Sequence, residues 1–225
     1  MTRVVWLGQA GLLFDFDGFR VMVDPYLSDS VAALDPAKHR RVPVDERFFE
    51  VKPDVLVLTH DHLDHTDPDT LGELFRRHGG VCVLASPNAW NTVRRFGGGN
   101  NYVRFARGAV WTEGSVRFEA LYAEHSDENA IGVLITAGGK RWYVTGDTLY
   151  SKRTLAELTG SPDVLFLPVN GVGNNMNMTD AARFAEAVGA RRTVPLHFGL
   201  FDGIDPRALS VPGTVIPEIY QEIRL

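Results

Sequence analysis

The chain has 225 residues, of which 44% are hydrophobic, and this is enough for one domain, residues 1–225, with a sizeable core. Its 28 acidic and 23 basic residues give a formal net charge of -5, which argues against a surface built mainly to bind nucleic-acid phosphates. No stretch approaches the roughly 20 apolar residues that span a bilayer, and the start "MTRVVWLGQAG" lacks the apolar run of a signal peptide. The single cysteine, Cys82, lies in the apolar stretch "VCVLAS" and cannot form an intrachain disulfide. We therefore expect a cytoplasmic protein without a membrane partner, and a buried Cys82.

The first quarter of the chain predicts short strands separated by turns that contain glycine. These strands are "RVVWLG" (3–8), "GLLFDF" (11–16) and "RVMVDPYL" (20–27). After a less regular stretch over residues 28–53, "DVLVLTH" (54–60) is a continuous apolar run, typical of a strand buried on both faces.

A helix is predicted directly after this buried strand. Asp67 can cap it, Pro68 suits its first position, and Gly79 can end it. Its apolar face has the spacing i, i+3, i+4 and i+7, at Leu71, Leu74, Phe75 and His78. The segment "LTHDHLDHTD" (58–67) therefore lies in a loop that leads from a strand into a helix.

The second half repeats this theme without a detectable sequence repeat. Further strands are predicted at "VRFEALYAEH" (116–125), "AIGVLITA" (130–137), "KRWYVTGD" (140–147), "DVLFLPVN" (163–170) and "RRTVPLHF" (191–198), with a weak helix near 149–159. Thr179 is expected to cap a second amphipathic helix that Gly189 ends. Strands come early and strand–helix units late in each half, which predicts an α+β fold with two sheets face to face and helices outside, an αββα sandwich.

The loop 58–67 has three histidines and three aspartates in ten positions. His60 and His62 alternate along an extended backbone and can point to one side, whereas Asp64 and His65 lie in the turn that enters the helix. This arrangement can hold two metal ions; neutral imidazole suits zinc, iron or manganese, and an aspartate can bridge two cations. The alternative is that the aspartates of the loop only cap and solvate the helix and the histidines are incidental.

Other side chains of the same types also follow predicted strands. His125 ends "FEALYAEH", Asp147 ends "WYVTGD" and His197 ends "TVPLH". Because residues at the carboxyl ends of several strands can meet at one edge of a sheet, we expect these three to join the loop 58–67 in one site. Asp24, in "MVDPYL", either orients these ligands or only begins a turn at proline.

The sequence "THDHLDH" matches the HxHxDH signature of the metallo-β-lactamase superfamily, and His125, Asp147 and His197 follow in the order that this superfamily needs. Within it, "HSDENAIGVLI", "VTGDT", "LPVNG", "NNMN" and "VPLHFGLFD" resemble the branch of L-ascorbate-6-phosphate lactonases. The resemblance implies an αββα fold with a dinuclear site at one edge. It also implies two sets of ligands with Asp147 between them: His60, His62 and His125 for one metal, and Asp64, His65 and His197 for the other.

Two departures from the resemblance concern the substrate. The chain is shorter than a typical ascorbate-phosphate lactonase, so loops that complete the substrate pocket can be missing. It also lacks the cysteine ligand of some zinc β-lactamases, because Cys82 is far from every motif, and this weakens an antibiotic-hydrolysing interpretation.

Two polar segments are candidates for contact with a small anionic substrate. The loop "NGVGNNMNMT" (170–179) offers Asn174, Asn175 and Asn177 for hydrogen bonds to hydroxyl or phosphate groups, or it is an ordinary turn. "KHRR" offers Lys38, Arg40 and Arg41 to an anion, although runs of charge are usually solvated.

We therefore predict a hydrolase that uses two divalent transition-metal ions, zinc or manganese with iron as a third candidate, in which Asp64 and Asp147 position the metals. The resemblance makes a lactone of a phosphorylated sugar acid the leading substrate. The alternatives are a phosphodiesterase or nuclease of the same fold, which the acidic balance disfavours, and a binding protein that holds metal without turnover. The sequence leaves open whether the chain forms a homo-oligomer.

Overall fold

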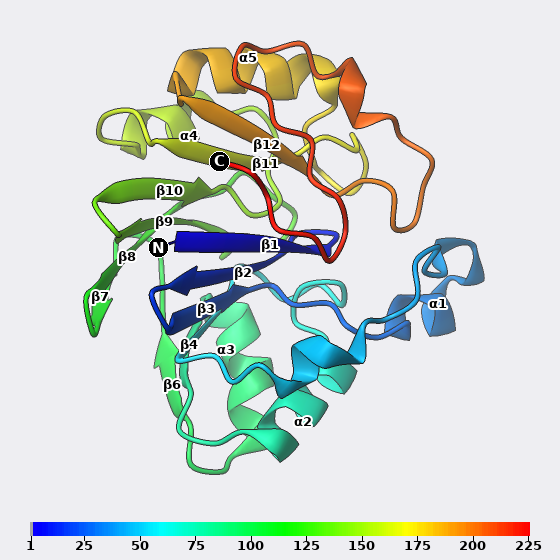
Figure 1. Ribbon diagram of the computed structural model, residues 1–225, viewed down its shortest axis with the longest axis vertical. Helices are drawn as coiled ribbons and strands as arrows, with labels where there is room; N and C mark the ends of the chain where they lie inside the picture. The colour runs from blue at the N-terminus through cyan, green and yellow to red at the C-terminus, as the bar shows by residue number, and fades with distance from the viewer. Residues whose placement is uncertain (1) are drawn as a thin grey trace.

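The computed structural model describes residues 2–225, in which two six-stranded sheets pack face to face (Figure 1). The first sheet contains β1 (Thr2–Gly8), β2 (Gly11–Phe16), β3 (Phe19–Val23), β4 (Val55–Leu58), β5 (Cys82–Ala85) and β6 (Asn101–Arg104). The second sheet contains β7 (Val110–Glu113), β8 (Val116–Tyr122), β9 (Ile131–Ala137), β10 (Lys140–Val144), β11 (Val164–Pro168) and β12 (Arg192–Leu196).

Four helices cover the outer faces of the two sheets. They are α2 (Pro68–Arg77) and α3 (Pro87–Val93) on the first sheet, and α4 (Lys152–Glu157) and α5 (Met178–Val188) on the second. Helices therefore flank the paired sheets on both sides, and the predicted αββα sandwich is confirmed.

Both sheets are built on the same plan. Strands β1 to β3 and β7 to β10 pair antiparallel, and the remaining neighbours, β3 to β6 and β10 to β12, pair parallel. Parallel strands direct their carboxyl ends to one edge of a sheet, and the loops that follow them are where a site can be assembled.

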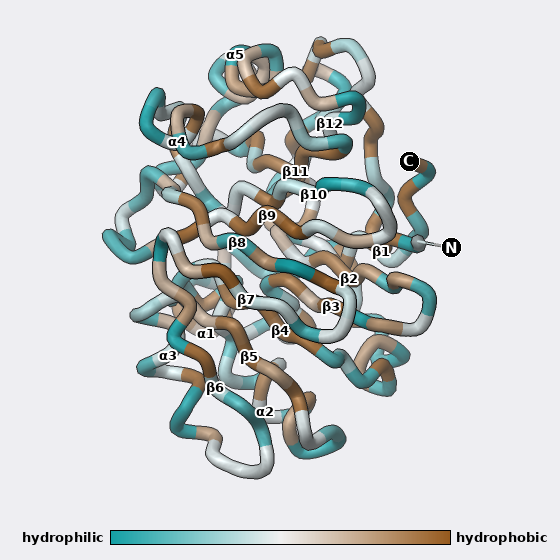
Figure 2. Tube along the Cα trace, turned by 90° about the vertical axis from the view of Figure 1, so that its left-hand side faces the viewer, coloured by the Kyte–Doolittle hydropathy of each residue, from teal (hydrophilic) through white to brown (hydrophobic). Residues whose placement is uncertain are grey.

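Strand β4 shows why its sequence is apolar throughout. Its side chains alternate with the period of two of a strand, so that Val55 and Val57 pack in the core between the sheets. Leu56 and Leu58 pack on the other face, in a second core that also contains residues of α2 and α3. The strand is therefore buried on both faces, as predicted, and Figure 2 shows the hydrophobic segments gathered in the strands of the interior.

The helix predicted after β4 is confirmed, and its start is set by the predicted cap. The side chain of Asp67 accepts hydrogen bonds from the backbone N–H groups of Asp69 and Thr70. The helix ends at Arg77, two residues before Gly79, and His78 closes it through its backbone N–H to the carbonyl of Leu74.

The cap predicted for α5 is wrong. Asn177, not Thr179, caps this helix, because the Asn177 side chain accepts from the backbone N–H of Asp180 at 2.9 Å and the helix begins at Met178. The predicted end is confirmed, since Gly189 has a φ of 67°, a left-handed conformation that favours glycine.

The stretch 28–53 contains short elements only: the helix α1 (Ser30–Leu34), which buries none of its residues, and the 3-10 turns Pro36–Lys38 and Glu46–Glu50. Two more 3-10 turns lie at Arg94–Phe96 and Pro206–Ala208. The carboxyl-terminal segment runs beside β1, where backbone N–H groups of Tyr220 and Ile223 donate to Trp6 and Val4 and cover the free edge of the sheet. Within residues 2–225, none of the helices has the length and apolar character needed to cross a membrane.

Candidate metal centre

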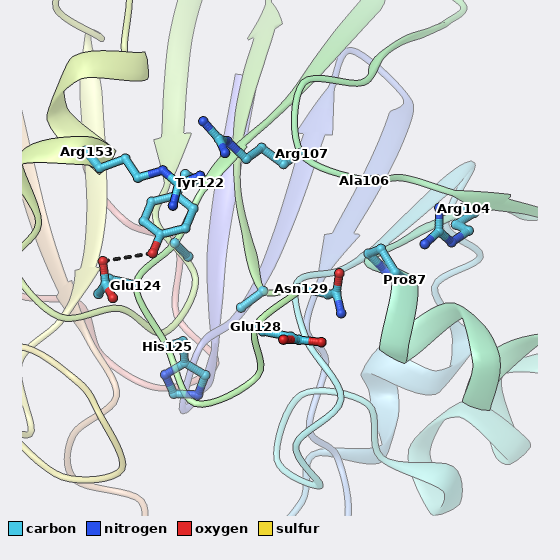
Figure 3. A pocket seen from close by; sticks show the side chains of 12 residues that line it. Pro87, Arg104, Ala106, Arg107, Tyr122, Glu124, His125, Glu128, Asn129 and Arg153 are labelled. Atoms are coloured by element: carbon cyan, nitrogen blue, oxygen red, sulfur yellow. Dashed lines mark hydrogen bonds between the residues drawn. The ribbon is translucent and has the colours of Figure 1, made fainter.

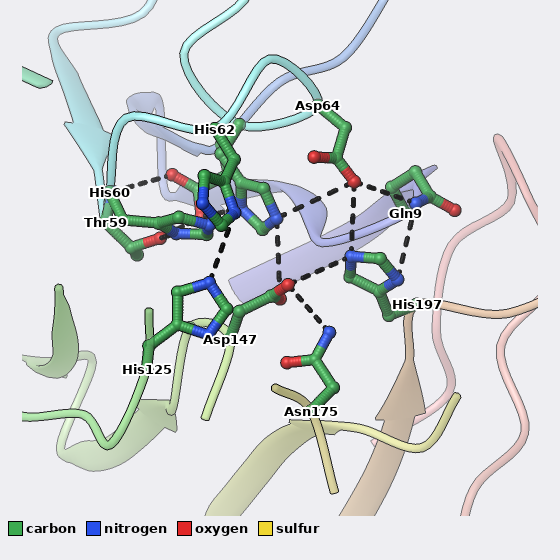
Figure 4. A network of polar contacts seen from close by, with 12 residues as sticks. Gln9, Thr59, His60, His62, Asp64, His125, Asp147, Asn175 and His197 are labelled. Atoms are coloured by element: carbon green, nitrogen blue, oxygen red, sulfur yellow. Dashed lines mark hydrogen bonds and ion pairs between the residues drawn. The ribbon is translucent and has the colours of Figure 1, made fainter. Parts of the chain in front are cut away.

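The predicted ligands come together from both sheets (Figure 4). The loop 59–67 follows β4 in the first sheet, whereas His125, Asp147 and His197 follow β8, β10 and β12 in the second. Residues that are up to 137 positions apart in sequence thus meet at one edge of the sandwich, as the strand-end pattern predicts.

One group of possible ligands consists of His60, His62 and His125, whose nitrogen atoms lie within 4.8 Å of one another. Nε2 of His125 is 3.2 Å from Nδ1 of His62, and the ring centroid of His60 is 4.6 Å from each of the other two rings. Three imidazoles at this separation can share one cation of the kind that nitrogen ligands favour.

A second group consists of Asp64, His65 and His197, whose ligand atoms also lie within 4.8 Å of one another. Asp147 joins this group: its Oδ2 is 3.2 Å from Nε2 of His197, and its Oδ1 is 3.4 Å from Nε2 of His65. Nε2 of His197 is also 3.3 Å from Oδ2 of Asp64. Asp147 therefore presents its two oxygens to two different histidines of this second group.

These atoms are suited to a metal because they are buried and make no hydrogen bond. Within residues 2–225 this holds for Nε2 of His60, His65 and His197 and for Oδ1 of Asp147. Buried polar atoms are rarely left in this state in proteins, since each one costs about 1–3 kcal/mol. Divalent transition-metal ions satisfy such a convergent set of imidazole and carboxylate atoms, so the residues present fit the metal that the sequence predicts.

The electrostatics of the site favour positive charge. Burial opposes the charged forms, but the carboxylates of Asp147 and Asp64 outweigh it, hold the pKa of His65 well above its usual range and raise the pKa of His197 to about 10. Burial also acts to raise the pKa values of Asp147 and Asp64, yet the neighbouring histidines hold both well below the usual range. The carboxylates are thus ionised at neutral pH and attract either protons on the histidines or cations in their place.

Two histidines of the first group, His60 and His125, have lowered pKa values instead of raised ones. Burial lowers the pKa of His60 well below its usual value, and the nearby His65 lowers it further. Burial also lowers the pKa of His125. Neutral imidazole is the form that binds a metal, so these two rings are ready for ligation without loss of a proton.

Asp24 orients the ligands and does not only begin a turn. Its Oδ2 accepts from Nδ1 of His65 at 2.8 Å and from the hydroxyl of Thr59 at 2.5 Å, while its Oδ1 accepts from the backbone N–H of Thr59 at 2.8 Å. This contact places the proton of His65 on Nδ1 and leaves Nε2 free to ligate. Asp24, His60 and His65 also lie within 4.8 Å of one another, but the carboxylate of Asp24 is already occupied by these hydrogen bonds.

Three amide side chains also contact the ligands. Gln9 donates to Oδ2 of Asp64 at 3.1 Å, Asn175 donates to Oδ2 of Asp147 at 2.7 Å, and the Asn170 amide lies 2.9 Å from Nδ1 of His197. The Asn170 oxygen makes no hydrogen bond within residues 2–225, and a half-turn of this amide would bring it to the Nδ1 proton that ligation by Nε2 requires.

Gln9 and Asn170 were not predicted. Both follow strands, β1 and β11, so the strand-end pattern that found the histidines would have found them if amides had been included.

A cavity of about 390 Å³ opens beside the second ligand group. His62, Asp64, Asp147 and His197 line it, so four of the seven predicted ligands face the same space. Its other walls include the apolar side chains of Val31, Val172 and Phe201. We call this space the metal-side cavity.

The structure separates the residues predicted to contact substrate. Lys38 and Asn175 line the metal-side cavity. The Arg40 guanidinium instead donates to the carbonyl of Tyr26 at 2.8 Å and to the hydroxyl of Tyr220 at 2.6 Å. The remaining three, Arg41, Asn174 and Asn177, are exposed and do not line the metal-side cavity.

Of these three, Asn177 has a structural role. Its side chain caps α5, so a hydrogen bond to substrate is not needed to explain it. Substrate contact stays a prediction for all six residues, of which Lys38 and Asn175 line the metal-side cavity.

The amino-acid sequence is similar to a known protein family and to individual relatives. Residues 19–198 match the family model described as the β-lactamase superfamily domain. A UPF0173 metal-dependent hydrolase of Geobacillus thermodenitrificans is 31% identical over 222 residues, which cover 91% of this chain and 90% of that protein. A UPF0173 protein of Pyrococcus furiosus is 28% identical over 215 residues, which cover 91% of this chain and 87% of that protein.

Solved structures agree on the fold. A metallo hydrolase from Ignicoccus hospitalis has a TM-score of 0.79 at 18% identity, covering 98% of this chain and 97% of that chain. An isothiocyanate hydrolase from Delia radicum gut bacteria has a TM-score of 0.76 at 18% identity, covering 99% of this chain and 98% of that chain. With its fold, its two groups of histidine and aspartate ligands and these relatives, the chain belongs to the metallo-β-lactamase superfamily, among the UPF0173 metal-dependent hydrolases.

Proposed function

We propose that the protein is a hydrolase with two transition-metal ions, zinc or manganese, that opens the lactone of a phosphorylated sugar acid. The observation that carries the proposal is the pair of neighbouring candidate ligand groups, with Asp147 in contact with His65 and His197 of the second. Members of both groups, His62 of the first and Asp64 and His197 of the second, line the metal-side cavity. Two bound cations would supply a nucleophile, by lowering the pKa of a bound water toward neutrality, and a Lewis acid for the carbonyl oxygen.

The chain's own residues support hydrolysis in three ways. Within residues 2–225, no serine, threonine or cysteine lines the metal-side cavity, so a hydroxyl or thiol nucleophile is not available there. Asp64 and Asp147 are ionised and compensate the charge of the cations. Asn175 fixes one oxygen of Asp147 through its hydrogen bond at 2.7 Å, which limits the positions that this carboxylate can take.

The cavity also bears on the substrate class. Its volume of about 390 Å³ suits a small molecule. Lys38 is the one basic side chain, apart from histidine, that lines it among residues 2–225, and Lys38 already pairs with Asp35 at 3.6 Å. A nucleic-acid backbone would need more positive charge than the metal-side cavity offers, so this cavity favours a small substrate over a polynucleotide.

A panel of substrates tests the proposal. Protein reconstituted separately with Mn²⁺ and Zn²⁺ is assayed with phosphorylated and plain sugar lactones, a phosphodiester and a thioester. We expect the lactones to be hydrolysed fastest and Asp147→Asn to abolish turnover. Faster cleavage of the phosphodiester than of any lactone would refute the lactonase proposal and favour the phosphodiesterase. No turnover with any substrate by protein that holds its metal would favour a binding protein.

A further inference from the structure

A second cavity, of about 450 Å³, borders the histidine pair His62 and His125 through His125. His125 lines this second cavity, whereas His62 lines the metal-side cavity, and their rings contact each other at 3.2 Å. A ligand in the second cavity would therefore lie next to the first ligand group.

Three arginines line this second cavity: Arg104 at the end of β6, Arg107 in the loop that follows, and Arg153 on α4. Figure 3 shows Arg107 and Arg153 together at the ring of Tyr122, Arg104 on the opposite side beside Pro87, and His125 at one end. We call this space the arginine pocket. Its cationic groups come from three separate elements and face one space, which a single run of surface charge would not produce.

Two of these guanidinium groups have no acidic partner. Arg107 pairs with Glu157, but neither Arg104 nor Arg153 forms an ion pair in the described part of the chain, residues 2–225. Arg153 stacks on the Tyr122 ring at 4.0 Å from its centroid, and the Tyr122 hydroxyl in turn donates to Glu124 at 2.8 Å. The stack orients the Arg153 guanidinium, whose charge is not neutralised by a carboxylate within residues 2–225.

The acidic side chains of the arginine pocket further limit the class of ligand that it can bind. Glu124 already accepts from the hydroxyls of Tyr122 and Ser151, at 2.8 and 3.3 Å. Glu128, exposed on the rim, forms no ion pair within residues 2–225 and can accept hydrogen bonds from hydroxyl groups. A compact oxyanion that also carries hydroxyl groups complements this combination, because the guanidinium fork matches phosphate and carboxylate oxygens.

We infer that the arginine pocket binds the phosphate or carboxylate group of the substrate, with Arg104 and Arg153 as its ligands. This inference rests on the proposed function, and it assigns to the arginine pocket the anion contact that "KHRR" and the loop 170–179 were predicted to supply. It also gives the substrate a direction: the reacting carbonyl lies at the metal centre and the anionic end lies beyond His125.

Protection of arginine side chains from chemical modification tests whether the arginine pocket binds an oxyanion, and it does not require a substrate that is turned over. Metal-loaded protein is treated with phenylglyoxal, which modifies arginine, with increasing inorganic phosphate, and modification is quantified by peptide mass spectrometry. At phosphate about ten times its Kd, we expect roughly tenfold slower modification of Arg104 and Arg153. Arg191, which is exposed and does not line the arginine pocket, should react at an unchanged rate. Equal protection of Arg191 and the two pocket arginines would overturn the inference.

A variant distinguishes phosphate bound in the arginine pocket from phosphate bound at the metal centre. In Arg104→Gln, protection of Arg153 should need about tenfold more phosphate, because one charged hydrogen-bond donor is lost. In the control Arg191→Gln, the concentration for protection should stay at the wild-type value. Unchanged protection of Arg153 in Arg104→Gln would place the phosphate elsewhere and overturn the inference.

Kinetics give a separate test of the substrate assignment. Arg153→Gln should raise KM for a phosphorylated lactone about 10- to 100-fold and leave KM for the unphosphorylated lactone near the wild-type value. Equal effects on both lactones would contradict the assignment. If no lactone is hydrolysed at all, the proposed function fails, while the protection measurement still decides whether the pocket binds an oxyanion.

Discussion

Replacement of Asp24 by asparagine should weaken metal binding without disturbing the fold. Asp24 is fully buried and has a φ of 43°, a conformation that asparagine adopts more readily than most residues. Its carboxylate accepts three hydrogen bonds, from the Thr59 backbone, the Thr59 hydroxyl and His65. An asparagine side chain has one oxygen where aspartate has two, so it cannot accept all three.

The consequence falls on His65. If the amide keeps its oxygen on the Thr59 backbone N–H, its NH₂ group faces Nδ1 of His65, and the proton of His65 is then favoured on Nε2, the atom that should ligate. Loss of such a partner typically lowers metal affinity about 10- to 100-fold, which corresponds to about 1.4–2.7 kcal/mol. We expect a decrease in this range for Asp24→Asn.

Competition with a chromogenic chelator measures this affinity directly and does not depend on a substrate. Asp54→Asn is a matched control, because Asp54 also accepts a backbone N–H, that of Arg20 at 2.8 Å, but does not contact a ligand. The control should bind metal as the wild type does. If Asp24→Asn binds both ions as tightly as Asp54→Asn does, Asp24 does not orient His65 and the reasoning is refuted.

Three further predictions concern the cap, the thiol and the protons of the site. Asn177→Ala should destabilise the protein by about 1 kcal/mol in denaturant unfolding, because the Asp180 N–H loses its cap, while KM stays constant; a raised KM at constant stability would restore Asn177 to the substrate site. Burial raises the pKa of Cys82 to about 12, so the folded protein should not react with Ellman's reagent at pH 8, and rapid labelling would contradict a buried thiol. Since the pKa of His197 is raised to about 10 and the pKa of His65 is held well above its usual value, both by neighbouring carboxylates, calorimetry in buffers of different ionisation enthalpy should detect release of protons when metal binds at pH 7; no release would show that these rings do not ligate.

The fold and the clustering of the candidate metal ligands were predictable from sequence for one physical reason. Apolar strands end where polar ligands begin, and parallel strands bring those ends to one edge. "DVLVLTH" therefore located both β4, which is buried on two faces, and the first histidine of the site. The same pattern gave His125, Asp147 and His197, although strand boundaries differed from those predicted by a few residues.

The positions of the candidate substrate contacts were less predictable, because they depend on where long side chains go. Arg40 is part of a basic run, yet its guanidinium donates to the Tyr26 carbonyl and to the Tyr220 hydroxyl. Tyr220 is 180 positions away in the sequence. Asn177 lies in a polar loop, yet it is one residue before a helix and serves as its cap. Arg104 and Arg153 are 49 positions apart, and no local pattern indicates that they line one cavity.

Metal content is the most direct test of the proposed dinuclear site, because the proposed hydrolysis requires two cations. Elemental analysis of the protein, purified without chelators and then reconstituted with Mn²⁺ or Zn²⁺, should give about two ions per chain, because seven nitrogen and oxygen ligands are too many for a single four-coordinate ion. A content near one ion, or one near zero that added metal does not restore, would contradict the dinuclear site and the hydrolysis proposed for it.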